Sequence, residues 1–278
     1  MYQISTASSQ DREEVIAFLE KQGLLENAEF ISNVFDAFQY SPEGISVLIC
    51  RLCDELVGVA RILEYWKIPP SPSGFKIDYD YDAHIDAVNR EAVKALLEMF
   101  PTDMLGDFPV IRPMIQEYFQ ELHDAKRIEG NLDFTTSSEH FRPVSGENVV
   151  ELTANDVGLF EGCERQRSWE YLEYDKDQVF AIIRNNRVAT SVAIGAIIPK
   201  SATKRRVIEI GGLYTETKYR HMGLGKRLIS HVTEIILQDG NIPIYWAGPK
   251  NIASQSLAKS LGYYQIGQMV TYRWRKKE

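Results

Sequence analysis

The chain has 278 residues, of which 44% are apolar and 25% charged, and its net charge is −8, a composition typical of one large or two medium-sized globular domains. No apolar run reaches the length of about 18 residues that a membrane-spanning helix needs. The first residues also lack the basic and apolar segments of a signal peptide, and the three cysteines do not suggest a disulfide framework. We therefore expect a cytoplasmic protein without a membrane partner.

Charge is divided unevenly along the chain. Residues 1–140 contain 11 Lys and Arg against 25 Asp and Glu, a net charge of −14, whereas residues 141–278 contain 20 against 14, a net charge of +6. This asymmetry favours the second half as the binding region for an anionic ligand. The basic ending RWRKKE carries only four cations on an acidic chain, so we expect no nucleic-acid partner.

The first half shows a mixed pattern of strands and helices. Apolar alternation and periodicity predict strands over 2–6, 45–52, 55–63, 75–81, 106–111 and 127–135, and helices over 11–38, 84–100 and 114–125. Cys50 and Cys53 form a CxxC within this region, which we interpret as part of a strand because no second pair of ligands accompanies it. No other metal motif is present, and we expect no metal site.

The second half repeats the same order of elements more clearly. We predict strands over 148–153, 178–184, 187–198, 207–215, 242–248 and 264–274, and helices over 156–173, 224–239 and 251–261. Asn185 and Asn186 are suited to a two-residue hairpin turn. The repeated order predicts an internal duplication of about 130 residues, with domains at 1–140 and 141–278 joined through a segment at 140–148 that is rich in Pro, Gly and polar residues.

A cationic, glycine-containing stretch, KYRHMGLGKRLISH, spans residues 218–231, between a predicted strand and a predicted helix. The N-terminus of a helix has unpaired backbone N–H groups and a partial positive charge, and it binds phosphate where side chains leave room. Gly223 and Gly225 provide that room, and Arg220, Lys226 and Arg227 add charge. The stretch therefore predicts a site for phosphate or pyrophosphate.

Two familiar phosphate-binding motifs do not fit this stretch. A dinucleotide fingerprint needs a third glycine or alanine where the chain has Leu228. A P-loop needs glycine at the position of Arg220 and Ser or Thr at that of Arg227.

A third motif does fit. RHMGLG, residues 220–225, resembles the R/Q-x-x-G-x-G/A motif of the GNAT acyltransferase superfamily, and VIEIGGLYTETKYRHMGLGKRLI resembles its fourth strand, loop and third helix. Downstream, NIASQSLAKSLGYYQIG is similar to the fourth helix and following strand of that family. The resemblance covers about 148–278, and over 1–140 it rests on element order alone. It implies an α/β (α+β) fold with a mixed, mostly antiparallel sheet flanked by helices, in tandem.

The resemblance also implies a co-substrate, acetyl-CoA or another acyl-CoA. In the family the loop before the third helix wraps the pyrophosphate with backbone N–H groups, and the splayed end of the fourth strand binds the pantetheine amides. Gly211 and Gly212, just before that end, would suit a bulge or a close approach to the backbone. Asn251 is either a contact to the cofactor or a plain helix cap. The residues carried over are Leu213, Tyr214, Thr215, Arg220, His221, Met222, Gly223, Leu224, Gly225, Lys226 and Asn251.

Glu209 is the candidate catalytic residue, because it interrupts an otherwise apolar strand eleven positions before Arg220, where histone-acetylating members of the family carry a general base. The alternative is a structural pair with an arginine of the 203–206 segment, and both stay open. The family often has a tyrosine as general acid where this chain has Ala258. Tyr245, Tyr263 and Tyr264 lie nearby in sequence, and none of them can be assigned to that role.

The leading interpretation is an N-acyltransferase that moves an acetyl or other acyl group from acyl-CoA to the amine of a small molecule or protein. Residues 141–278 would form the catalytic domain, and residues 1–140 a degenerate copy or a cap. One alternative is a protein that binds or senses acyl-CoA without turnover, which Ala258 favours. Another is an interaction module whose glycines serve only close packing.

Overall fold

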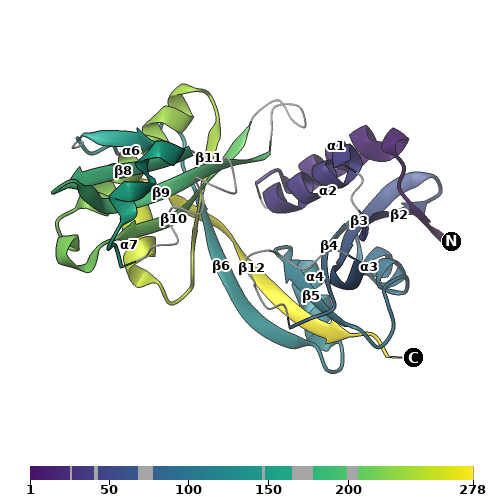
Figure 1. Cartoon of the computed structure of the whole chain (residues 1–278). Helices are drawn as coiled ribbons and strands as arrows, with labels where there is room; N and C mark the ends of the chain where they lie inside the picture. The colour runs from purple at the N-terminus through teal and green to yellow at the C-terminus, as the bar shows by residue number, and fades with distance from the viewer. Residues whose placement is uncertain are drawn as a thin grey trace. The chain divides into compact units, whose positions relative to one another are not determined.

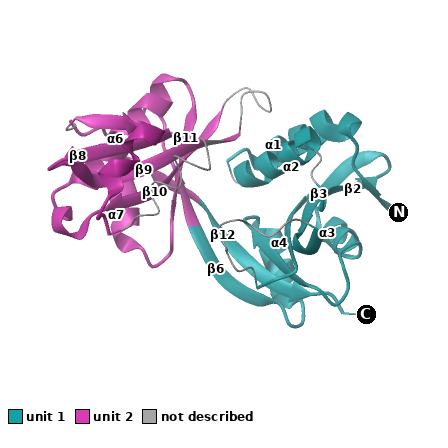
Figure 2. Ribbon diagram, in the orientation of Figure 1, with its two compact units in different colours: residues 1–131, 267–278 teal, residues 132–266 magenta. Residues whose placement is uncertain are grey.

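The computed structural model describes residues 1–25, 27–40, 43–67, 78–145, 148–164, 178–198 and 206–277. The chain forms two compact units (Figures 1 and 2). Unit 1 comprises residues 1–131 and 267–278, and unit 2 comprises residues 132–266. None of the described helices combines the length and the apolar character that crossing a membrane requires.

Unit 1 contains a sheet with the strand order β1-β2-β3-β4-β5-β12, in which β4 and β5 are parallel and the other pairs antiparallel. Its elements are β1 (Tyr2–Thr6), η1 (Ser9–Asp11), α1 (Arg12–Gly23), α2 (Ala28–Tyr40), β2 (Ile45–Leu52), β3 (Glu55–Glu64), η2 (Tyr65–Lys67), β4 (Tyr81–Ala87), α3 (Arg90–Leu97), β5 (Leu105–Val110), α4 (Pro113–Glu121), β6 (Lys126–Thr135, completed in unit 2) and β12 (Tyr264–Arg275, begun in unit 2).

The core of unit 1 lies between one face of this sheet and the helices α3 and α4. Leu96 of α3 and Phe119 of α4 pack there with Ala83 and Ile85 of β4, and all four side chains are buried. The opposite face of β4 carries polar side chains and is covered by α2, whose Phe30 stacks on His84 with 5.4 Å between the ring centroids. Helices therefore cover both faces of the sheet.

Unit 2 repeats the arrangement with the strand order β6-β11-β10-β9-β8-β7, in which β10 and β11 are parallel and the other pairs antiparallel. Its remaining elements are β7 (Val149–Leu152), η3 (Ala154–Phe160), β8 (Gln178–Arg184), β9 (Arg187–Ile198), β10 (Val207–Thr215), η5 (Thr217–Tyr219), α6 (Leu224–Gln238), β11 (Ile242–Ala247) and α7 (Ile252–Ser260).

One face of the unit 2 sheet packs against α6 and α7, through a core that includes Ile208, Ile210, Leu228 and Ala258. The predicted turn at Asn185 and Asn186 is confirmed, because both residues have positive φ and the flanking Arg184 and Arg187 are paired. The predicted mixed, mostly antiparallel sheet flanked by helices, present in tandem, is confirmed as well.

The two units differ from the expected domains 1–140 and 141–278, because two strands change units along their length. The end of β6, at 132–135, pairs with β11 of unit 2, whereas the second half of β12, residues 270–275, pairs with β5 of unit 1. Each sheet is thus completed by the last strand of the other half of the sequence. The segment at 140–148 is rich in turn-forming residues, but local composition carries no information on which distant strands will pair.

Four predicted elements of the sequence need comment. The helix predicted over 84–100 is wrong at its start, because residues 81–87 form β4 and α3 begins at Arg90, with the Asn89 side chain accepting a hydrogen bond from the Ala92 N–H. The helix predicted over 11–38 is two helices, α1 and α2. The first part of the helix predicted over 156–173 is the 3-10 helix η3, and residues 165–173 lie outside the described residues. The strand predicted over 75–81 is wrong at 78–80, because β4 begins only at Tyr81, and residues 75–77 lie outside the described residues.

Candidate functional site

The N-terminus of α6 is uncapped and sterically open, so a ligand can approach its backbone closely. Gly223 is its N-cap, with a φ of +76°, and no side chain caps the helix. A Cβ at Gly223 would meet no other atom within 4 Å, so the space in front of the helix is open. A Cβ at Gly225 would lie 3.3 Å from Thr215 Oγ1 and 3.6 Å from a methyl of Leu213. The first N–H groups of α6 are therefore left to face the open space, with the positive end of the helix dipole behind them.

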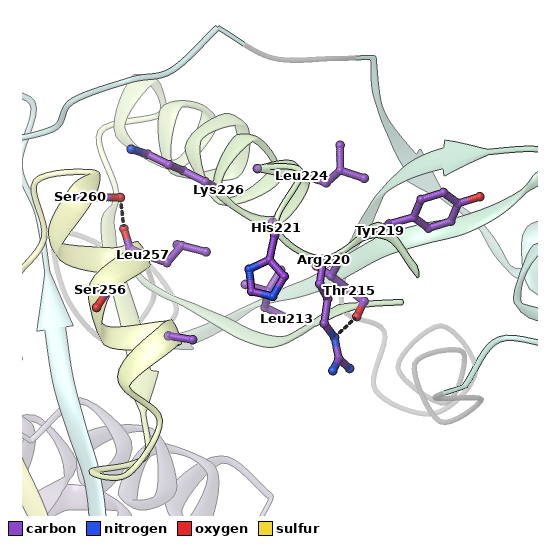
Figure 3. Close-up of a pocket in the computed structure, with 13 residues that line it drawn as sticks. Leu213, Thr215, Tyr219, Arg220, His221, Leu224, Lys226, Ser256, Leu257 and Ser260 are labelled. Atoms are coloured by element: carbon purple, nitrogen blue, oxygen red, sulfur yellow. Dashed lines mark hydrogen bonds between the residues drawn. The ribbon is translucent and has the colours of Figure 1, made fainter. Parts of the chain in front are cut away.

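An open cavity of about 440 Å³ lies in front of this helix end, between α6, the end of β10 and one face of α7 (Figure 3). This is the size range of small-molecule sites. Its lining residues are Leu213, Thr215, Tyr219, Arg220, His221, Gly223, Leu224, Gly225, Lys226, Ala253, Ser256, Leu257 and Ser260.

Eight of the eleven residues that the sequence proposed for the cofactor are brought together in this lining. The three others lie elsewhere. The Met222 side chain is exposed to solvent, the Tyr214 hydroxyl donates to Glu164, and Asn251 Oδ1 accepts from the Ser254 N–H at 3.1 Å as the N-cap of α7. For Asn251 the structure therefore supports the capping role.

The strands β10 and β11 separate next to the cavity. They pair in parallel only from Val207 and Ile242 to Ile210 and Tyr245. Beyond this point β10 continues to pair with β9, with a register shift between Gly211 and Tyr214 and a φ of +66° at Gly212. The bulge predicted at the glycine pair is thus present, and on the side of β11 the backbone of 211–215 has no strand partner among the described residues.

Glu209 lies on the opposite face of the sheet from α6. Ile208 and Ile210 pack in the core under α6, and because side chains alternate along a strand, Glu209 and Gly211 face the other way. The Glu209 carboxylate leans over Gly211, since a Cβ built at Gly211 would lie 2.7 Å from Glu209 Oε1. The carboxylate is therefore next to the point where β10 and β11 separate. The alternative role for Glu209 is an ion pair with an arginine of the 203–206 segment. Residues 199–205 lie outside the described residues, so most of that segment is not described.

Arg220 and His221 occupy the loop between β10 and α6, residues 216–223, called here the β10–α6 loop. Arg220 Nε donates to the Thr215 carbonyl at 3.0 Å and the guanidinium lies 5.6 Å from the centre of the Tyr214 ring. His221 has a φ of +62°, a conformation that few residues other than glycine adopt, and its ring lines the cavity (Figure 3). Lys226, in the first turn of α6, adds a positive charge to the lining.

The sequence-based reasoning missed the face of α7 that closes the cavity. Ala253, Ser256 and Ser260 lie on this face with Leu257, and their spacing of three and four residues puts them on one side of the helix. The available signal was their size, because small side chains along one face of a helix leave room for a ligand.

Among the described residues, Tyr219 is the one tyrosine that lines the cavity, and none of the three candidates for the general acid does so. Ala258 is completely buried and faces the sheet, away from the cavity. The Tyr245 hydroxyl is 2.6 Å from Ser254 Oγ and that of Tyr263 is 2.7 Å from Thr233 Oγ1, and burial raises the pKa of both phenols. The third candidate, Tyr264, is exposed beside His140.

In a comparison with known protein families, residues 193–274 match the model of the family described as FR47-like protein. A comparison with curated proteins finds no match.

Solved structures are similar over almost the whole chain. An acetyltransferase of the GNAT family from Colwellia psychrerythraea has a TM-score of 0.62 at 10% identity, covering 98% of this chain and 100% of its own. A tandem GNAT protein from the clavulanic acid biosynthesis pathway has 0.62 at 12% identity, covering 99% and 98%. A GCN5-related N-acetyltransferase from Sphaerobacter thermophilus has 0.60 at 10% identity, covering 100% and 97%. The resemblance to the GNAT superfamily is confirmed, and at such low identity the likeness of these structures establishes the fold, not the activity.

Proposed function

We infer that this chain, which has the tandem GNAT fold and an FR47-like region in its C-terminal part, is an N-acyltransferase whose unit 2 binds acyl-CoA. The observation that carries the proposal is the uncapped N-terminus of α6, which opens on the cavity beside Lys226. Unpaired N–H groups at the positive end of a helix favour the doubly charged pyrophosphate of CoA. The N–H groups from His221 to Lys226 would hold it.

The separation of β10 and β11 supports the second part of the binding mode. The backbone of Leu213, Tyr214 and Thr215 borders this opening, and its polar groups can pair with the two amides of the pantetheine arm as an added strand would. The reactive thioester would then lie near Gly211, where the Glu209 carboxylate leans.

Glu209 is proposed as the general base. The amine nitrogen of the acceptor attacks the thioester carbonyl, Glu209 accepts the proton that the nitrogen loses, and the carbon–sulfur bond breaks to release the thiolate. The thiol of CoA has a pKa near that of cysteine, about 8.5, so the thiolate can leave near neutral pH without a general acid. Holding the two reactants in register would supply much of the remaining acceleration.

A second candidate function is acyl-CoA binding without turnover. It is favoured by the cavity lining, in which the described residues include no tyrosine other than Tyr219 of the β10–α6 loop. Acyl transfer to a panel of amines, both small molecules and peptides, separates the two functions, because a binding protein gives no product with any acceptor.

Titration calorimetry with CoA and acetyl-CoA tests the binding step, and we expect one site per chain. Glu209→Gln should reduce the rate of transfer by about 10²-fold or more while changing CoA affinity less than threefold, because the base acts on the acceptor. If Glu209→Gln and the unmodified protein transfer the acyl group at equal rates across pH, Glu209 is not the general base and its role is structural. Absence of CoA binding would contradict the proposed function as a whole.

A further inference from the structure

Glu164, which follows η3, contacts several residues at the end of β10 and in the β10–α6 loop. One carboxylate oxygen, Oε2, accepts hydrogen bonds from the Tyr214 hydroxyl at 2.6 Å, from Thr217 Oγ1 at 2.7 Å and from the Thr217 N–H at 3.3 Å. Tyr214 belongs to the end of β10 and Thr217 to the β10–α6 loop. A single side chain 50 residues away in sequence therefore ties the strand to the loop.

Two further contacts join the same network. The Glu164 N–H donates to Glu216 Oε1 at 3.0 Å, and Glu216 is only 7% exposed. Arg220 Nη2 lies 4.0 Å from Glu164 Oε2 and donates to the Tyr214 hydroxyl at 3.3 Å. Glu164 thus contacts four residues between 214 and 220. This segment directly precedes His221 and Gly223, which have positive φ.

The charge of Glu164 is the wrong one for direct contact with a phosphate. A carboxylate near the proposed pyrophosphate position would oppose its binding by Coulomb repulsion. Its hydrogen bonds indicate an indirect role, which is to hold the β10–α6 loop in place. A loop that is already held in its bound shape loses less conformational entropy when a ligand binds.

We propose that Glu164 is a positioning residue for acyl-CoA, which keeps the N–H groups of the β10–α6 loop and the first turn of α6 aligned before the ligand arrives. This role rests on the proposed function of the same site. It makes the hydrogen-bonding capacity of the side chain important and its negative charge unimportant or mildly unfavourable. Glutamine and alanine at position 164 should therefore behave differently.

Calorimetry with CoA on the full chain tests this difference. Glu164→Ala should weaken CoA binding by about tenfold, whereas Glu164→Gln, whose amide oxygen can still accept from Tyr214 and Thr217, should stay within about threefold. Tyr214→Phe, which removes one of the three hydrogen bonds, should fall between them. Glu161→Ala, at an exposed glutamate three residues earlier, is the matched control and should bind as the unmodified protein does.

Hydrogen exchange without ligand separates positioning from a general loss of structure. In Glu164→Ala we expect faster exchange confined to residues 216–226, with the amides of β8 and β9 unchanged. Equal CoA affinity in the unmodified protein and Glu164→Ala, or an equal change in affinity for alanine and glutamine, would overturn the positioning role. If the unmodified protein binds no CoA, the proposed function fails, while unchanged exchange at 216–226 in Glu164→Ala would by itself refute the contact network as the device that orders the loop.

Discussion

The two units share one plan but treat the same place in it differently. In unit 2, β10 and β11 separate next to an open cavity, and an eight-residue loop leads to an uncapped helix. In unit 1 the corresponding parallel strands, β4 and β5, pair only at Tyr81 with Gly106 and Asp82 with Asp107 before they too separate. Only Val88 and Asn89 connect β4 to α3.

The position of the phosphate site is closed in unit 1. The side-chain oxygen of Asn89 accepts from the Ala92 N–H, so the end of α3 is capped by its own chain, in contrast to that of α6. Asp86, 1% exposed, then accepts hydrogen bonds from Arg112 and from Asn27 Nδ2, which lies 2.7 Å from its Oδ2. An ion pair between the buried Asp86 carboxylate and the partly exposed Arg112 therefore lies at β4 beyond its pairing with β5, in the part of unit 1 that corresponds to the proposed acyl-CoA site. The difference teaches that the fold alone does not make a binding site, since loop length and capping decide it.

The largest effect is expected from breaking the closed site of unit 1. Asp86→Ala removes the carboxylate and leaves the guanidinium of Arg112 without its buried partner, so we expect a loss of about 3 kcal/mol in the free energy of unfolding. Urea denaturation measures it, with Glu13→Ala at an exposed position as the control.

A rescue variant checks the physical cause of this loss. Asp86→Leu combined with Arg112→Met replaces the ion pair by apolar side chains, and buried ion pairs are often replaceable in this way without loss of stability. We expect the double variant to be more stable than Asp86→Ala. Stability of Asp86→Ala within about 0.5 kcal/mol of the unmodified protein would contradict the view that this pair holds the region closed.

The same pair of units shows what could be predicted from the sequence. The β10–α6 loop and α6 were predictable because their signals are local: Gly223 and Gly225 stand beside cations, and Leu224, Leu228 and later apolar residues keep helical spacing. The strand β4 was missed because His84 and Asp86 place polar groups on its buried second face. Burial lowers the pKa of His84 to about 4, which keeps the ring neutral there.

The remaining misses depend on contacts between distant residues. The partners of Asp86 are Asn27 and Arg112, and Glu164 bonds to Tyr214, separations that no local pattern records. The exchange of the last strands has the same origin, because no local pattern in β6 or β12 records that the one pairs with β11 and the other with β5. Which of them pairs with β5 is decided by the packing of the whole chain.

The second largest effect is expected from a substitution at the open helix end of unit 2. Gly225→Glu places a negative side chain at the end of α6 that faces the cavity, so we expect CoA affinity to fall by about 100-fold or more, equivalent to about 2.7 kcal/mol. Calorimetry provides the measurement. Gly225→Ala is the matched control: its Cβ would lie 3.3 Å from Thr215 Oγ1, which a small shift accommodates, so its affinity should fall by less than tenfold. If Gly225→Glu is folded and binds CoA normally, the phosphate does not lie at this helix end.

The smallest effect concerns Ala258, the position at which the resemblance to the GNAT superfamily leads us to expect a tyrosine. Ala258 is fully buried against the sheet with Tyr245 and Leu261, so Ala258→Tyr forces a large side chain into a packed core and should cost about 1–3 kcal/mol of stability. The new phenol would not reach the cavity, and we expect no gain in acyl transfer.

Ser256→Tyr is the contrasting variant, because Ser256 lines the cavity on the exposed face of the same helix. It should leave stability within about 0.5 kcal/mol of the unmodified protein while weakening CoA binding by occupying the cavity. Faster transfer by Ala258→Tyr than by the unmodified protein, with the same acceptors, would show that the phenol does reach the thiol and that α7 moves during the reaction.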